Sequence, residues 1–123
     1  MEKGQLIAIV DDDALIRETL KDLLDSAGYT SVVFSSAKGF LKSKRLATFA
    51  CLITDMRMPG TTGIELRQKL VNAGHAIPTI LITAYPDETV RARALRAGVL
   101  CYLPKPVMSD ALLACLDEAL ESR

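Results

Sequence analysis

Short apolar runs alternate along this chain with longer segments in which apolar residues recur at helical spacing. Each run has the length of a strand and is rich in Ile, Val, Leu or Thr. Runs that lack an apolar–polar alternation are typical of strands covered by helices on both faces. We therefore predict five buried strands, at Leu6–Val10, Val32–Phe34, Cys51–Thr54, Thr79–Thr83 and Leu100–Leu103.

The segment after the first run predicts an amphipathic helix that ends at Gly28. Charged residues occupy one side of this helix, and an apolar stripe occupies the other. The stripe consists of Leu15, Ile16, Leu20, Leu23, Leu24 and Ala27. Four further helices are predicted, at Ala37–Arg45, Gly63–Ala73, Asp87–Ala97 and Ser109–Glu121.

This fivefold alternation of strand and helix predicts the fold class. Parallel strands joined by right-handed helical crossovers form a sheet with helices on both faces. The sequence thus predicts a three-layer, doubly wound α/β fold with a five-stranded parallel sheet. A length of 123 residues suits one domain with one core, so we expect residues 1–123 to form a single domain.

Charge and hydropathy exclude several partners. Fifteen basic residues balance fifteen acidic ones, so no basic surface for nucleic acid or a membrane is indicated. The longest stretch without a charged side chain, residues 70–86, contains Gly and Pro and cannot be a spanning helix. The first apolar run is too short for a secretory signal. We expect a cytoplasmic protein.

The three cysteines, Cys51, Cys101 and Cys115, lie in apolar segments. Their odd number and the lack of a C-x-x-C spacing predict buried structural thiols in a reducing compartment.

Chemically active side chains follow four of the five predicted strands. Asp11, Asp12 and Asp13 follow the first, Asp55 ends the third, Thr83 ends the fourth, and Lys105 follows the fifth. Sites in open parallel sheets form outside the carboxyl ends of the strands. We therefore expect these carboxylates, a hydroxyl and a lysine to meet at one edge.

Crowded carboxylates need a cation to offset their repulsion. An all-oxygen donor set without His or Cys favours Mg²⁺ or Mn²⁺, and Mg²⁺ pairs naturally with phosphoryl oxygens. A carboxylate can attack phosphorus to give an aspartyl phosphate, and a metal, a lysine and a hydroxyl would then meet the transferred charge.

Each residue also has a plain structural interpretation. Asp13 directly precedes the first helix and is best explained as its cap. Alone, Asp55 could be a turn residue and Lys105 a solvated loop charge. The coincidence of all these groups at four strand ends favours a functional site over separate structural roles.

The chain resembles the receiver domain of two-component response regulators over nearly its whole length. The resemblance rests on Val10-Asp11-Asp12-Asp13, Thr54-Asp55-Met56-Arg57-Met58-Pro59-Gly60, Gly63, Ile82-Thr83-Ala84, Gly98 and Tyr102-Leu103-Pro104-Lys105-Pro106. The Asp-Met-Arg-Met-Pro stretch is most similar to FixJ-type receivers. The family implies a flavodoxin-like fold with strand order 2-1-3-4-5 and five helices.

The resemblance also implies residue roles. Asp55 would accept the phosphoryl group, and Lys105 would pair with one of its oxygens. Asp11, Asp12, Asp55 and the main-chain carbonyl of Arg57 would hold Mg²⁺ or Mn²⁺.

Two further positions complete the expected switch. Thr83 would bind another phosphoryl oxygen, and Tyr102 would change rotamer with it. The Lys105–Pro106 peptide is expected to be cis.

The implied function is a phospho-accepting receiver, not an enzyme beyond its own phosphorylation and dephosphorylation. The expected partners are a sensor histidine kinase and, after phosphorylation, a second copy of the chain. A transcriptional output domain or partner would be controlled through the face made by the fourth helix, fifth strand and fifth helix. The domain itself would contact neither membrane nor nucleic acid.

Two other interpretations remain open. Asp11-x-Asp13 after a strand also occurs in haloacid-dehalogenase-type phosphatases, where Asp11 would be the nucleophile, although Leu15 and the short chain argue against this class. A degenerate receiver that only binds partners is the third class.

Overall fold

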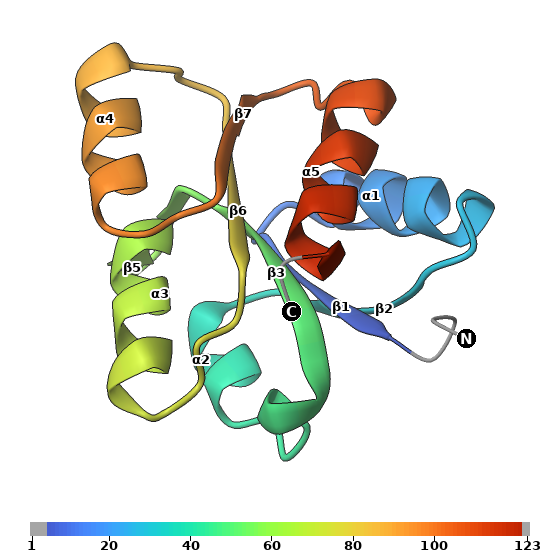
Figure 1. Cartoon of the computed structure of the whole chain (residues 1–123), viewed down its shortest axis with the longest axis horizontal. Helices are drawn as coiled ribbons and strands as arrows, with labels where there is room; N and C mark the ends of the chain where they lie inside the picture. Colours follow the sequence, from blue (N-terminus) through green and yellow to red (C-terminus); the bar gives the residue numbers. More distant parts are fainter. Residues whose placement is uncertain (1–4, 122–123) are drawn as a thin grey trace.

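The computed structural model describes residues 5–121 of the chain, which form a parallel sheet between two layers of helices (Figure 1). The main strands are β1 (Leu6–Val10), β2 (Thr30–Phe34), β3 (Phe49–Asp55), β6 (Thr79–Thr83) and β7 (Cys101–Pro104). The helices are α1 (Ala14–Ser26), α2 (Ala37–Leu41), α3 (Gly63–Asn72), α4 (Glu88–Arg96) and α5 (Ser109–Glu121). Short elements are the 3-10 turn η2 (Leu46–Thr48) and the strands β4 (Arg57–Met58) and β5 (Thr61–Thr62).

The order of the main strands confirms the predicted doubly wound topology. They lie as β2-β1-β3-β6-β7, all paired in parallel, which is 2-1-3-4-5 when only these five are counted. Helices α1 and α5 cover one face of the sheet, and α2, α3 and α4 cover the other (Figure 1).

Alternation along each buried strand divides the core between the two faces. On β1, Ile7 and Ile9 pack with α1 and α5, whereas Ala8 and Val10 pack with α2 and α3. All four side chains are fully buried. Because both faces are covered, the strand carries no polar position, which explains its continuous apolar run.

The second predicted helix is shorter than its pattern suggested. Residues Ala37–Arg45 were expected to be helical, but α2 ends at Leu41 and Lys42 is its C-cap. The Ser43 hydroxyl accepts a hydrogen bond from the Arg45 amide at 3.1 Å. Such a local side-chain bond offers the backbone an alternative to the helical ladder, and η2 follows in place of another turn.

Leu15 departs from the predicted apolar stripe of α1. Its side chain is 68% exposed, whereas Leu20 and Leu24 are buried against the sheet. Leu15 is exposed because it lies in the first turn of the helix, near the carboxyl edge of the sheet. The buried leucines lie farther along the helix, over β1 and β3.

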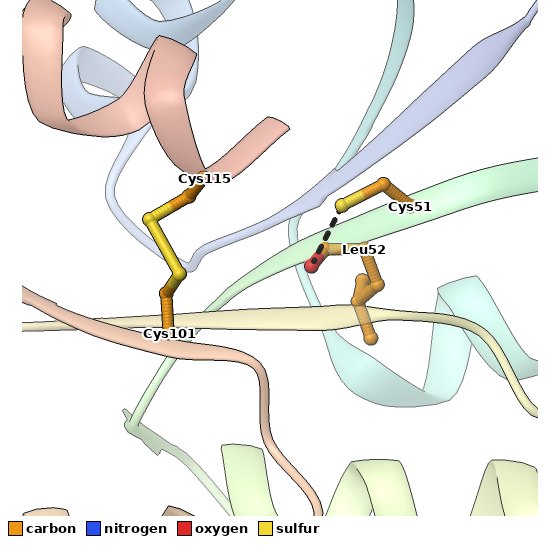
Figure 2. The surroundings of a disulfide bond; sticks show 4 residues. All are labelled: Cys51, Leu52, Cys101 and Cys115. Carbon is orange, nitrogen blue, oxygen red and sulfur yellow. Dashed lines mark hydrogen bonds between the residues drawn. A yellow bond between two sulfur atoms is a disulfide. The ribbon is translucent and has the colours of Figure 1, made fainter. Parts of the chain in front are cut away.

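The prediction of unpaired thiols is wrong for two of the three cysteines. Cys101 on β7 and Cys115 on α5 form a disulfide, while Cys51 lies buried on β3 (Figure 2). Sequence spacing gave no sign of this pairing, because it arises from the packing of α5 on β7.

None of the helices in residues 5–121 combines the length and apolar character needed to span a membrane.

Candidate functional site

Three carboxylates converge at the carboxyl edge of the sheet. Val10 on β1 is in register with Thr54 on β3, so the residues that follow them, Asp11 and Asp55, lie side by side. One carboxylate oxygen from each of Asp11, Asp12 and Asp55 lies within 4.8 Å of the others. Asp11 and Asp55 are buried and Asp12 is exposed, so the cluster forms a pocket with one open side.

Lys105 closes this pocket from the end of β7. Its amide donates to the Thr83 carbonyl at 2.8 Å, which fixes the loop against β6. Its ammonium group lies 3.0 Å from Asp11 Oδ2 and 3.5 Å from Asp55 Oδ2, and the side chain is only 14% exposed. The Lys105–Pro106 peptide is cis, as predicted. A single cation therefore contacts both buried carboxylates.

The negative charge of Asp55 is only partly compensated by its surroundings. Burial and the neighbouring Asp11 raise the pKa of Asp55, and Lys105 with the Arg57 amide only partly offsets them. For Lys105, burial lowers the pKa, but Asp11 and Asp55 outweigh burial and raise it above the ordinary value. The lysine is therefore firmly charged, and the pocket retains an excess of negative charge.

One buried carboxylate oxygen, Oδ2 of Asp11, is paired with the Lys105 ammonium but accepts no hydrogen bond within the described residues. Asp11 Oδ1 accepts from the Asp13 amide at 2.9 Å, but no described residue donates a hydrogen bond to Oδ2. Its ion pair with Lys105 is close, yet it lacks hydrogen-bond alignment. An unsatisfied buried oxygen among carboxylates fits a hard divalent cation such as Mg²⁺, which takes oxygen ligands.

Arg17 is a supporting residue that the sequence did not single out. Its guanidinium Nη1 donates to the Asp11 carbonyl at 2.7 Å from the second turn of α1. This contact holds the backbone of the acidic loop from the helix side. The only sequence signal was a basic residue near the start of a helix, where the helix dipole disfavours one.

The loop after Asp55 is held by close backbone packing. Met56 donates its amide to the Ile82 carbonyl at 2.8 Å, and Gly63 donates to the Met56 carbonyl at 2.9 Å. A Cβ at Gly63 would lie 2.9 Å from the Asp55 carbonyl and also overlap Leu81. Only glycine allows α3 to begin this close to the end of β3.

Thr83 and Tyr102 line one cavity between the acidic pocket and α4. The cavity has a volume of about 220 Å³ and also includes Arg57 and Tyr85. The buried Thr83 hydroxyl accepts from the Tyr85 amide at 3.1 Å, which leaves its hydrogen available to a further acceptor. The Tyr102 hydroxyl accepts from the Asp87 amide at 3.2 Å, at the N-cap of α4.

Arg57 lines this cavity together with Tyr85. The guanidinium carbon lies 5.2 Å from the centre of the Tyr85 ring, in a cation–π contact. The structure thus brings most of the predicted site residues together at the carboxyl edge of the sheet. They are Asp11, Asp12, Asp55, Lys105, Thr83 and the backbone of Arg57, and Tyr102 lines the cavity next to Thr83. Asp13 lies outside the cluster as the predicted cap, its carboxylate accepting from the Leu15 amide at 2.9 Å.

Comparison with known proteins agrees with this arrangement. The family model described as response regulator receiver domain matches residues 7–117. The transcriptional regulatory protein FixJ of Bradyrhizobium diazoefficiens is 35% identical over 114 residues, which are 93% of this chain and 56% of FixJ. The response regulator TmoT of Ectopseudomonas mendocina is 35% identical and matches 98% of this chain and 54% of its own length. The chain therefore spans about half the length of these curated relatives.

Solved structures show the same likeness. The response regulator StyR superposes with a TM-score of 0.87 at 41% identity, covering 96% of this chain and 60% of StyR.

Proposed function

Because the chain belongs to the response regulator receiver domain family, we propose that it accepts a phosphoryl group on Asp55 from the phosphohistidine of a sensor kinase. The observation that carries this proposal is the contact of Lys105 with the carboxylates of both Asp11 and Asp55, at 3.0 and 3.5 Å. Residues 1–123 would act as a single receiver domain in the cytoplasm.

The reaction would proceed by attack of an Asp55 carboxylate oxygen on phosphorus. The new oxygen–phosphorus bond forms as the bond from phosphorus to the donor histidine nitrogen breaks, and that nitrogen keeps the electron pair. Lys105 already lies near both buried carboxylates, so it would neutralise one oxygen of the incoming group. The Thr83 hydroxyl would donate its available hydrogen to another.

A divalent cation fits the donor set of this pocket. Asp11, Asp12, Asp55 and the main-chain carbonyl of Arg57 would hold Mg²⁺ or Mn²⁺, and the unsatisfied Asp11 Oδ2 supports this assignment. When bound, the ion supplies positive charge to the acidic pocket and to a phosphoryl oxygen. Catalysis would be limited to phosphorylation and dephosphorylation of the chain itself.

The structural change at the phosphorylation site would be transmitted through Thr83 and Tyr102. If Thr83 moves toward the phosphoryl group, space opens in the shared cavity, and Tyr102 can turn inward. That rotation would break the bond from the Asp87 amide to the Tyr102 hydroxyl at the start of α4. The α4–β7–α5 face would change in response.

This face suits a second copy of the chain. Helix α4 carries Arg91, Arg93 and Arg96, while α5 carries Asp110, Asp117, Glu118 and Glu121. Basic α4 of one copy and acidic α5 of another carry opposite charges, which favours pairing between two copies. Relatives named as transcriptional regulatory proteins support a transcriptional output domain or partner.

The proposal is tested by intact-mass analysis after incubation with Mg²⁺ and acetyl phosphate. We expect one phosphoryl group on the native chain, none on Asp55→Asn, and one on the control Asp13→Asn, whose side chain caps α1. Steady hydrolysis of the donor that depends on Asp11 and leaves Asp55→Asn active would instead indicate a phosphatase. No modification and no turnover would indicate a degenerate receiver.

A further inference from the structure

The disulfide between Cys101 and Cys115 joins two elements of the proposed output face. Cys101 is the first residue of β7, and Cys115 lies in the middle of α5 (Figure 2). Their Cα atoms are 6.5 Å apart, within the range that a disulfide spans without backbone movement. Both residues are partly exposed and lie at the margin of the core between α5 and the sheet.

The packing of α5 does not depend on this crosslink. Leu112, Leu116 and Ala119 of α5 are fully buried in the core that also contains Ile80 and Ile82 of β6. Because this apolar contact does not involve the sulfur atoms, we expect it to hold the helix on the sheet in the dithiol form as well. The fold is therefore compatible with both the dithiol and the disulfide.

The cytoplasmic location proposed for this chain affects whether the dithiol or the disulfide form is present. Glutathione and thioredoxin keep cytosolic thiols reduced, and cytosolic disulfides are usually transient and redox-sensing. Partly exposed disulfides are also the labile ones, since a thiolate can attack them. A partly exposed pair beside a core that is otherwise apolar has the properties of such a sensor.

We infer that Cys101 and Cys115 are a reversible redox switch that low-molecular-weight disulfides such as oxidised glutathione close. One cysteine thiolate attacks oxidised glutathione, forms a mixed disulfide, and releases one glutathione. The second thiolate attacks the protein sulfur of that mixed disulfide, forms the Cys101–Cys115 bond and releases the other glutathione. The protein loses two electrons and two protons, and oxidised glutathione takes up both.

Closing the switch would act on the strand that carries the proposed signal. Neighbouring side chains of β7 point to opposite faces, so Cys101 packs with α5 while Tyr102 packs with the α4 side. Oxidation thus ties α5 to the strand whose other face contacts the N-cap of α4. This effect on output rests on the proposed function, whereas the redox reaction does not.

The reaction is tested on the intact chain without any phosphodonor. The chain is equilibrated with glutathione buffers from strongly reducing to strongly oxidising, quenched with acid, alkylated and weighed. We expect a form lighter than the fully alkylated chain by two alkyl groups, since the joined sulfur atoms cannot be alkylated, to appear at intermediate ratios and to be reversed by reduced glutathione. Cys51→Ala is the matched control, because it removes a cysteine outside the pair and should respond in the same way.

Two variants and one stability measurement make the outcome decisive. Cys101→Ala and Cys115→Ala should each lose the internal disulfide and show a glutathione adduct at most. Oxidation of the native chain should raise the melting temperature by about 5–10 °C, since the bond closes a loop between positions 14 residues apart. A pair that stays reduced, or stays oxidised, at every ratio would overturn the switch, as would equal melting temperatures of the two forms.

Discussion

Replacing Asp55 by Asn is expected to stabilise the folded chain in the absence of divalent cations. The substitution keeps the shape of the side chain and removes its charge from a pocket where Asp55 is 7% exposed. Because burial and Asp11 raise the pKa of Asp55, the ionised carboxylate is less favourable in the folded state than in the unfolded chain.

The magnitude follows from the distances in the pocket. One carboxylate oxygen of Asp11 lies within 4.8 Å of one of Asp55, so it repels the Asp55 charge by at least about 3.5 kcal/mol at an effective dielectric constant of about 20. Lys105, at 3.5 Å, attracts it by about 5 kcal/mol on the same scale. Exposed Asp12 adds no more than about 1 kcal/mol of repulsion. These terms nearly cancel, so the desolvation of the carboxylate decides the sign, and we expect a gain of about 1–2 kcal/mol.

Urea unfolding at neutral pH, with a chelator and then with Mg²⁺, measures this gain. With chelator, Asp55→Asn should have the larger free energy of unfolding. With Mg²⁺ the difference should shrink, because the ion stabilises the native carboxylate cluster more than the neutralised one. The control Asp13→Asn should stay within about 0.5 kcal/mol of the native chain, since Asn and Asp cap helices equally well.

The pH dependence has a definite sign. A raised pKa means that the folded chain takes up the Asp55 proton at a higher pH than the unfolded chain does. The penalty is therefore full at neutral pH and disappears as the pH falls through the raised pKa. An Asp55→Asn chain that is less stable than the native chain in chelator, or equal stabilisation of both by Mg²⁺, would refute this account of the pocket.

Three further outcomes test other parts of the structure. Gly63→Ala should lower the free energy of unfolding by about 1–3 kcal/mol in urea, because the added methyl group overlaps Leu81 and the end of β3; an unchanged value would contradict this close approach. Glu65→Ala should lower the free energy of unfolding at neutral pH but not in acid. The Thr62 amide lowers the pKa of Glu65, so the stability that the Glu65 carboxylate contributes is lost as the pH falls through that lowered value. A destabilisation that does not depend on pH would argue against the capping box. Sedimentation should show a larger species when a beryllofluoride phosphoryl mimic is added, and an unchanged size would exclude dimerisation through α4 and α5.

The strand ends could be predicted from sequence because two simple rules suffice to place them. Continuous apolar runs identify strands covered on both faces, and parallel strands present their carboxyl ends at one edge. Asp11, Asp55 and Lys105 each follow such a run, so their convergence needed no knowledge of side-chain packing. Thr83 at the end of β6 follows the same logic.

The features that the sequence did not reveal depend on contacts between distant segments or on very short elements. The β4–β5 hairpin has two residues in each strand, too few to show a period. The hydrogen bond from Arg17 to the Asp11 carbonyl and the cation–π contact of Arg57 with Tyr85 each need a specific rotamer. Periodicity reports which face is buried, and it carries no information on which side chains meet across that face.

Strand β7 links the cysteine pair to the carboxylate pocket. The backbone of Lys105 fixes the end of this strand to Thr83, and the ammonium group reaches the two buried carboxylates. Tyr102 of the same strand contacts the start of α4, and its neighbour Cys101, on the opposite face, is bonded to α5. A displacement of β7 driven from the carboxylate pocket must therefore act on both helices of the proposed output face. If the disulfide holds α5 against that displacement, then phosphorylation must in turn shift the glutathione ratio at which the pair is half oxidised, because coupling between two sites is reciprocal.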